Sequence, residues 1–454
     1  MPLILGTNSI KDTGYNVDNS CRFDRASTDN MTKSMSDGSS IKGTFSAWIK
    51  VDGTGNEMNI LSHFEDTNNV FTIGTSGSGI NVVDYNDAYT LQLSTNRLMR
   101  DPSAWFHLYV AIDRSQGTAN NRNRIFINGV EETSFSHRTN YGQQTSGGHQ
   151  DAISMNDGDC TMYLGGLGDG NQMFGGYLAE VVWLDGTASA VTNFGEFDED
   201  SGIWKPIDVS GLSSSKGTNG FYLDFEDASN LGNDAFGGTD LGENNIVAAN
   251  QSTDTCTNNF ATMNPLDTNS NHTLSEGNLK TVYSAAAGTF GVTKGTIGVS
   301  AGKWYWEIKY TYGNAGQFGV FDINDLDTLN TTDIFSAAGN STFEGLAWRI
   351  DTSNNIKEVG VGQSADSGLD FASGAILGIA FDADNGKFYG FKNGAEITGQ
   401  DIGAGTSLLT AVTVSDFYLP FVSNGDGGSG TKTGTSEFNF GSPPFAISSS
   451  NADA

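Results

Sequence analysis

The chain has 454 residues and carries 53 acidic against 23 basic side chains, which gives a formal net charge of −30. This balance argues against a protein that tracks nucleic-acid phosphates or adheres to anionic lipid, because both activities need a basic surface. The hydrophobic content of 37% and the aromatic content of 11% are too high for a disordered chain, and the length suggests two domains.

No segment has the pattern of a membrane span or a secretory leader. The most apolar stretches, such as 374–381, are far shorter than the roughly 18 residues of a span. Cys21, Cys160 and Cys256 are widely separated and form no CxxC pair, so we expect buried thiols rather than disulfides or a zinc site. These features fit a protein made in a reducing cytoplasm.

The first half consists of short apolar runs separated by Gly, Asn, Asp and Ser. Residues 45–51 and 105–112 are rich in aromatic and β-branched side chains, which favours strands. The run 124–127 leads into Asn128-Gly129, a pair that tolerates the positive φ angles of a type I′ turn and therefore predicts a hairpin.

The second half has the same pattern without repeating the sequence. Residues 303–310 and 375–381 read as strands, and 382–386 read as a turn. Asn393-Gly394 then follows the strand 387–391, so two tight turns join three strands in a meander. Helical periodicity is almost absent, and we predict an all-β chain of two antiparallel β-sandwiches.

The domain boundaries follow from composition. Residues 1–229 are expected to form the first sandwich, 276–447 the second, and 448–454 a loose polar tail. Between the sandwiches, 230–275 is polar and Asn-rich without helix signals, and we interpret it as an interdomain segment that could still pack on one domain.

Catalytic patterns are weak. Glu196, Asp198 and Asp200 alternate along the chain, as do the acidic residues of β-sandwich glucanases, but the other face would carry Phe197 and Glu199. We therefore interpret this run as a solvated acidic loop. His107 stands in the middle of a predicted strand and is expected to be a packed residue rather than a ligand.

A structural calcium ion is the one cofactor that the composition suggests. Asp157 and Asp159, like Asp322 and Asp325, lie in turns rich in oxygen donors, and Ca²⁺ binds six to eight oxygens. Neither pair matches an EF-hand loop, and Asp is also a common turn residue. Both readings stay open.

Two aromatic groups are candidates for ligand binding. Tyr85, Asn86, Asp87 and Tyr89 form a polar and aromatic segment of the kind that holds sugars, although it could equally be a plain surface loop. Trp304 and Trp306 lie two apart on a strand and so share a face, either in the sandwich core or as a stacking platform.

The first half resembles concanavalin A-like, laminin-G-type jelly-roll domains through the segment 101–113, which contains a predicted strand, and the hairpin 123–131. More narrowly, segments 19–23, 176–186, 204–206, 217–223 and 263–266 are similar to tail-fibre or related virion proteins of marine bacteriophages. The second half resembles a SPRY domain through 302–307, 377–382, 386–394, 418–422 and 439–441. The binding loops of the SPRY family vary, so no ligand residue carries over.

These resemblances imply a non-enzymatic virion protein, assembled in the host cytoplasm and displayed on the particle. We expect a tail fibre or fibre-like appendage that binds a host surface polysaccharide or protein. A head decoration or fibre-anchoring protein that contacts other virion proteins is the alternative, and a glycan-degrading enzyme is a second one. The resembled fibres imply a homo-oligomer, commonly a trimer.

Overall fold

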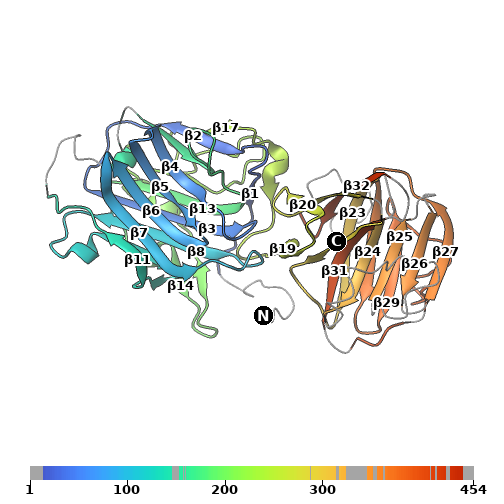
Figure 1. Cartoon of the computed structure of the whole chain (residues 1–454). Helices are drawn as coiled ribbons and strands as arrows, with labels where there is room; N and C mark the ends of the chain where they lie inside the picture. Colours follow the sequence, from blue (N-terminus) through green and yellow to red (C-terminus); the bar gives the residue numbers. More distant parts are fainter. Residues whose placement is uncertain are drawn as a thin grey trace. The chain divides into compact units, whose positions relative to one another are not determined.

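The computed structural model divides into two compact units, of which the first ends at Asn259 and the second begins at Phe260 (Figure 1). The structure describes residues 14–145, 153–156, 158, 160–286, 288–312, 316–323, 345–350, 355–360, 363–409, 411–414, 417–425 and 430–442. Within these ranges, regular structure is almost entirely antiparallel β, so the predicted all-β class is confirmed.

Two large sheets form the first unit. One has the order β10 (Val130–Glu131), β9 (Asn123–Ile127), β8 (Phe106–Asp113), β3 (Lys42–Val51), β13 (Gly176–Asp185), β1 (Ser20–Phe23) and β18 (Gln251–Ser252), with β16 (Phe221–Leu223) also paired to β13. The other has the order β11 (Phe135–Thr139), β7 (Ala88–Leu98), β6 (Gly79–Asn86), β5 (Asn69–Ser76), β4 (Met58–Asp66), β12 (Thr161–Leu164), β2 (Asn30–Ser34) and β17 (Gly242–Asn244).

Smaller elements complete this unit. A separate two-stranded ribbon joins β14 (Gly195–Phe197) to β15 (Trp204–Pro206). Short 3-10 turns lie at Ala119–Asn121, Ser154–Asn156, Val191–Asn193, Ser210–Ser215 and Ala248–Asn250. In the described part of the chain, no helix is long and apolar enough to cross a membrane.

The core of the first unit lies between its two large sheets. Alternate side chains of β6 and β7, such as Val82 and Leu93, meet those of the opposite sheet, such as Ile49 and Leu178. This period of two is the sandwich pattern, in which each strand buries one face. Cys21, Cys160 and Cys256 are all buried thiols outside disulfides, as predicted.

The segment 230–275 is divided between the two units instead of connecting them as a free linker. β17 pairs with β2, and β18 pairs with β1, so the residues up to Asn259 belong to the first sandwich. Asp254 reinforces this attachment through a buried ion pair with Lys50 on β3, at 2.7 Å between Nζ and Oδ2. Distant pairing of this kind leaves no local signal in a polar sequence.

The second unit also consists of two sheets. One has the order β19 (Met263–Thr268), β22 (Phe290–Gly295), β31 (Tyr418–Gly425), β24 (Gly316–Asp322), β25 (Gly345–Ile350), β26 (Asn355–Gly360) and β27 (Gln363–Asp370). The other has the order β20 (His272–Ser275), β21 (Lys280–Ala286), β32 (Thr431–Asn439), β23 (Lys303–Tyr312), β28 (Ala375–Asp382), β29 (Lys387–Lys392) and β30 (Ala395–Glu396). Their facing side chains, including Trp348, Phe388 and Ile308, form a second core.

The predicted tight turns are confirmed by their backbone angles. Asn128 and Gly129 have φ of 49° and 74°, and Asn393 and Gly394 have φ of 49° and 80°. Both positions of each pair are therefore left-handed, as the turn between hairpin strands requires. The predicted meander is also confirmed, because β28, β29 and β30 pair consecutively.

Candidate ligand pocket on the C-terminal unit

A ladder of polar side chains crosses three neighbouring strands of the second unit. Lys303 on β23 is paired in register with Asp382 on β28, which is paired in register with Lys387 on β29. Side chains directly opposite each other across antiparallel strands share a face. The three charged groups therefore form a Lys–Asp–Lys row across the sheet.

The next row on the same face is apolar and aromatic. Ala380 on β28 lies in register between Tyr305 on β23 and Tyr389 on β29. Because the small Ala380 stands between larger neighbours, this row leaves a depression in the sheet surface beside the charged row.

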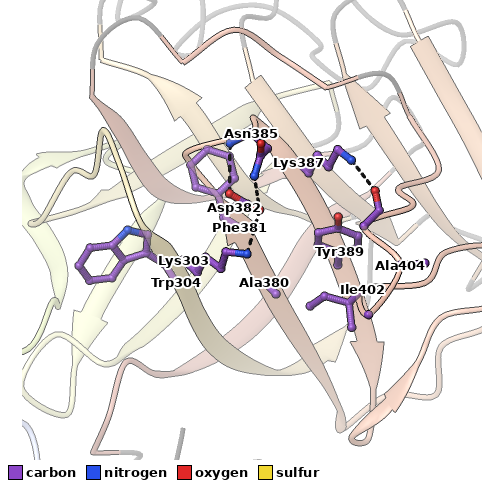
Figure 2. A pocket seen from close by; sticks show the side chains of 12 residues that line it. Lys303, Trp304, Ala380, Phe381, Asp382, Asn385, Lys387, Tyr389, Ile402 and Ala404 are labelled. Carbon is purple, nitrogen blue, oxygen red and sulfur yellow. Dashed lines mark hydrogen bonds and ion pairs between the residues drawn. The ribbon is translucent and has the colours of Figure 1, made fainter.

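Both rows, apart from Tyr305, line a surface pocket of about 340 Å³ together with a neighbouring loop (Figure 2). Ile402, Gly403, Ala404 and Gly405 supply the loop wall. Asp401 and Thr406 exchange two backbone hydrogen bonds of 2.8 Å at the base of this loop. The complete lining consists of Lys303, Trp304, Ala380, Phe381, Asp382, Asn385, Lys387, Tyr389, Ile402, Gly403, Ala404 and Gly405.

The carboxylate of Asp382 is held by its neighbours. Asn385 Nδ2 donates to Asp382 Oδ2 at 2.9 Å, and Lys303 Nζ lies 3.4 Å from the same oxygen. Burial by itself would raise the pKa of Asp382, but these hydrogen bonds and the Lys303 charge outweigh it, and the pKa is lowered. Asp382 is therefore a fixed anionic acceptor at neutral pH.

Lys387 is held differently. Its ammonium group donates to the backbone carbonyl of Gly405 (Figure 2), which joins β29 to the loop wall. In the described residues it forms no ion pair within 4 Å, whereas Lys303 is paired with Asp382. The pocket thus offers donors on two sides of one acceptor, beside the apolar surface of Ala380, Tyr389 and Ile402.

The predicted Trp304 and Trp306 pair does share a face, but it is the core face. Trp306 is buried in the second core, and Trp304 is partly buried against the same core. Trp304 also lines the pocket, yet Figure 2 shows its indole pointing away from Lys303 and the other polar side chains. Since neighbouring residues on a strand face opposite ways, Lys303 faces the pocket instead.

Tyr85, Asn86, Asp87 and Tyr89 lie together at the hairpin between β6 and β7. The rings of Tyr85 and Tyr89 are 5.1 Å apart in an edge-to-face arrangement, and Tyr89 is 54% exposed. Asp87 adopts a positive φ of 51° and donates its backbone N–H to Asn68 of the neighbouring hairpin. Asn86, Asp87 and Tyr89 are exposed and Tyr85 is partly buried, so the group is a surface feature at the end of this hairpin.

The acidic run at Glu196 is only partly a loop. Glu196 belongs to β14, where it faces Lys205 of β15, and the turn that follows carries Asp198 and Asp200. Lys205 Nζ lies 3.3 Å from Glu196 and 3.4 Å from Asp198. Hydrogen bonds from the backbone and hydroxyl of Ser201 lower the pKa of Asp198 to about 2, the opposite of what a general acid for glycoside cleavage needs.

Of the predicted calcium ligands, only Asp322 lies within the described residues. It ends β24, opposite Tyr418, and is buried. Asp157, Asp159 and Asp325 lie outside the described residues. Among the residues that the structure does describe, no three His, Cys, Asp or Glu side chains are grouped to hold a metal ion.

His107 is a packed residue, as predicted. It is fully buried, its Nε2 is 2.8 Å from the Ser46 hydroxyl, and its Nδ1 accepts from the indole of Trp204 at 3.1 Å. Burial lowers the pKa of His107 to about 3, so the ring is neutral and structural.

Lys303, Asn385, Lys387 and Tyr389 were not candidates from sequence, although each lines the pocket. One local signal existed, because the turn 382–386 places Asp382 opposite Lys387. The contribution of Lys303 depends on the pairing of strands about 80 residues apart in sequence, which the turn chemistry does not reveal.

Comparison with known proteins gives no family match and no similar curated protein. Similar solved structures include the SPRY domain of human HERC1, with 14% identity and a TM-score of 0.28, covering 39% of this chain and 98% of that domain. The PSpry domain of TRIM65 has 13% identity and a TM-score of 0.28, covering 39% and 88%. The stonustoxin structure has 19% identity and a TM-score of 0.27, covering 39% of this chain and 27% of its own. SPRY domains are the group that the second half resembles in sequence, and TM-scores this low say nothing about binding.

Proposed function

We propose that this chain is a non-enzymatic binding protein whose second unit holds a saccharide from a host surface. The pocket beside the Lys303–Asp382–Lys387 row carries this proposal. Its volume lies within the roughly 300–1,000 Å³ range of small-molecule sites, and a few fixed polar groups set the orientation of a ligand in such sites. A sugar ring presents hydroxyls around an apolar C–H face, which matches donors and an acceptor placed beside Ala380 and Tyr389.

The non-enzymatic part of the proposal has its own support. Of the acidic residues considered for glycoside cleavage, Glu196 and Asp198 are held by Lys205 on an exposed ribbon. In the pocket, Asp382 is the one carboxylate among the lining residues, whereas glycosidases use two. This arrangement suits recognition better than bond cleavage.

We infer that the protein is displayed on a bacteriophage virion, in a tail fibre or similar appendage with a laminin-G-type first unit. The support is the set of sequence segments similar to virion proteins of marine phages, among them 176–186 and 217–223. Cryo-EM of particles carrying a labelled copy would place the protein. A label confined to the head would contradict the fibre assignment and favour a decoration protein.

Filling the pocket tests the saccharide proposal. Ala404 lies on the exposed loop wall, so Ala404→Trp would occupy the pocket without touching the core. Ala395→Trp is the matched control, because Ala395 is also exposed, on β30 of the same unit, and does not line the pocket. On a glycan microarray, we expect the full-length protein and the control to bind a defined set of saccharides, and Ala404→Trp to lose that set.

Two results would contradict the proposal. One is the absence of saccharide binding by the unmodified chain. The other is binding that Ala404→Trp leaves unchanged while its melting temperature matches that of the control.

A further inference from the structure

The pocket has more basic than acidic side chains, the reverse of the chain as a whole. Basic side chains number 23 against 53 acidic ones in the whole chain, yet two lysines and one aspartate face this cavity. The three charged groups of the pocket therefore sum to about +1 at neutral pH, in a molecule whose net charge is −30.

The two lysines of the pocket differ in their partners among the described residues. Lys303 is 75% exposed and forms an ion pair with the carboxylate of Asp382. Lys387 is half-buried, and its ammonium donates to the neutral carbonyl of Gly405. A carbonyl orients an ammonium group without cancelling its charge, and an ammonium carries three donors, so Lys387 keeps donors for a ligand.

Three nearby carboxylates that do not line the pocket accept hydrogen bonds from backbone N–H groups. Asp384 accepts from the N–H of Gly302 at 2.7 Å, Glu396 from that of Ile402 at 2.7 Å, and Asp401 from that of Ala404 at 2.8 Å. These contacts hold the turns around the pocket. The three carboxylates keep their charge, but they do not line the pocket, so within the lining the ammonium of Lys387 is the group that a negative group of a ligand would contact.

We propose that the saccharide held in this pocket carries an anionic group, a carboxylate or a sulfate ester, which binds to the ammonium of Lys387. This inference rests on the proposed saccharide function and specifies the class of its ligand. A charge-assisted hydrogen bond from a half-buried ammonium is stronger than one between neutral groups. The acceptor Asp382 and the donor Asn385 would then contact the sugar hydroxyls.

The test compares ligands that differ only in charge. Short galacturonate oligomers, their methyl esters, sulfated galactan oligomers and neutral galactan oligomers would be titrated into the full-length protein by calorimetry. We expect at least one anionic series to bind ten-fold or more tightly than its uncharged counterpart. The uronate and sulfate arms identify which anion the pocket prefers.

A matched pair of lysines tests the residue. Lys392 also lies on β29, and its ammonium donates to the backbone carbonyl of Asp370, away from the pocket. Lys387→Met should abolish the preference for the charged ligand, Lys387→Arg should retain most of it, and Lys392→Met should leave it unchanged. Melting curves of the three variants check that they are folded.

The titrations separate three outcomes. Equal affinity of the unmodified protein for charged and uncharged ligands would overturn the anionic assignment and leave the saccharide function standing. A preference that survives Lys387→Met in a folded protein would overturn the role of Lys387. Absence of binding to every saccharide would overturn both proposals.

Discussion

Glu180 is a buried carboxyl group whose titration is coupled to folding. It lies at a bulge of β13, where the register shifts between Ala179 and Val182, and it adopts a positive φ of 51°. Tyr15 and Tyr222 donate their hydroxyls to its Oε2 at 3.1 and 2.9 Å. Burial raises the pKa of Glu180 from 4.5 to about 7, because the charged form loses its hydration, and these hydrogen bonds only partly oppose the rise.

The sign of the resulting pH dependence follows from linkage. A carboxyl group with a raised folded-state pKa binds more protons when folded, so its contribution to stability is complete below pH 4.5 and is lost as the pH rises towards 7. The contribution is on the order of 3 kcal/mol. We expect the free energy of unfolding of the unmodified protein to fall between about pH 4.5 and 7 relative to Glu180→Gln. Urea unfolding at several pH values measures this change. The same pH dependence of the unfolding free energy in both proteins would contradict the assignment.

The Asn128-Gly129 turn shows how one element depends on a distant one. Gly129 has φ of 74°, and a Cβ at this position would lie 2.2 Å from the ring of Trp204. The ring also donates from Nε1 to His107 at 3.1 Å. The turn between β9 and β10 is therefore packed on β15 as well as being left-handed.

Gly129→Ala should be more damaging than an ordinary Gly→Ala change at positive φ. Gly55 is the control, since it has φ of 81° and nothing within 4 Å of its absent Cβ. We expect Gly55→Ala to cost about 1 kcal/mol and Gly129→Ala several times as much, measured by urea unfolding. Equal costs would show that the Trp204 contact does not constrain the turn.

The elements differ in how far the sequence predicts them. Hairpins such as 124–131 and 387–397 are predictable, because Asn-Gly chemistry and alternation are local. The β14–β15 ribbon was missed, because its acidic side chains resemble a solvated loop and its ion pairs with Lys205 join residues across the turn. The pocket was missed for the related reason that Lys303 and Asp382 meet through a long-range strand pairing.

At the scale of the whole molecule, the two units have separate cores, one containing Trp183 and the other Trp348. We therefore expect two transitions in calorimetry rather than one. Asp254→Asn shows which transition belongs to the first unit. The substitution removes the carboxylate that forms an ion pair with the ammonium of Lys50, a side chain that is 1% exposed. Breaking a buried pair costs about 3–5 kcal/mol, so one transition should move down by roughly 10 °C while the other stays in place.

A single transition that moves as a whole would contradict the independence of the two cores. The charge of −30 bears on the same measurement. Asp and Glu are spread over the turns of both units, so salt should screen their repulsion throughout the chain. Both transitions are therefore compared at one ionic strength.

The position of a bound saccharide distinguishes the pocket on the second unit from the Tyr85 and Tyr89 hairpin on the first. The measurement is a crystal structure of the full-length protein, from crystals soaked with the oligomer that binds most tightly. We expect ligand density over Ala380, between Lys303 and the loop residue Ile402, in contact with Lys387. Density at the Tyr85 and Tyr89 hairpin instead, with this pocket left empty, would contradict it.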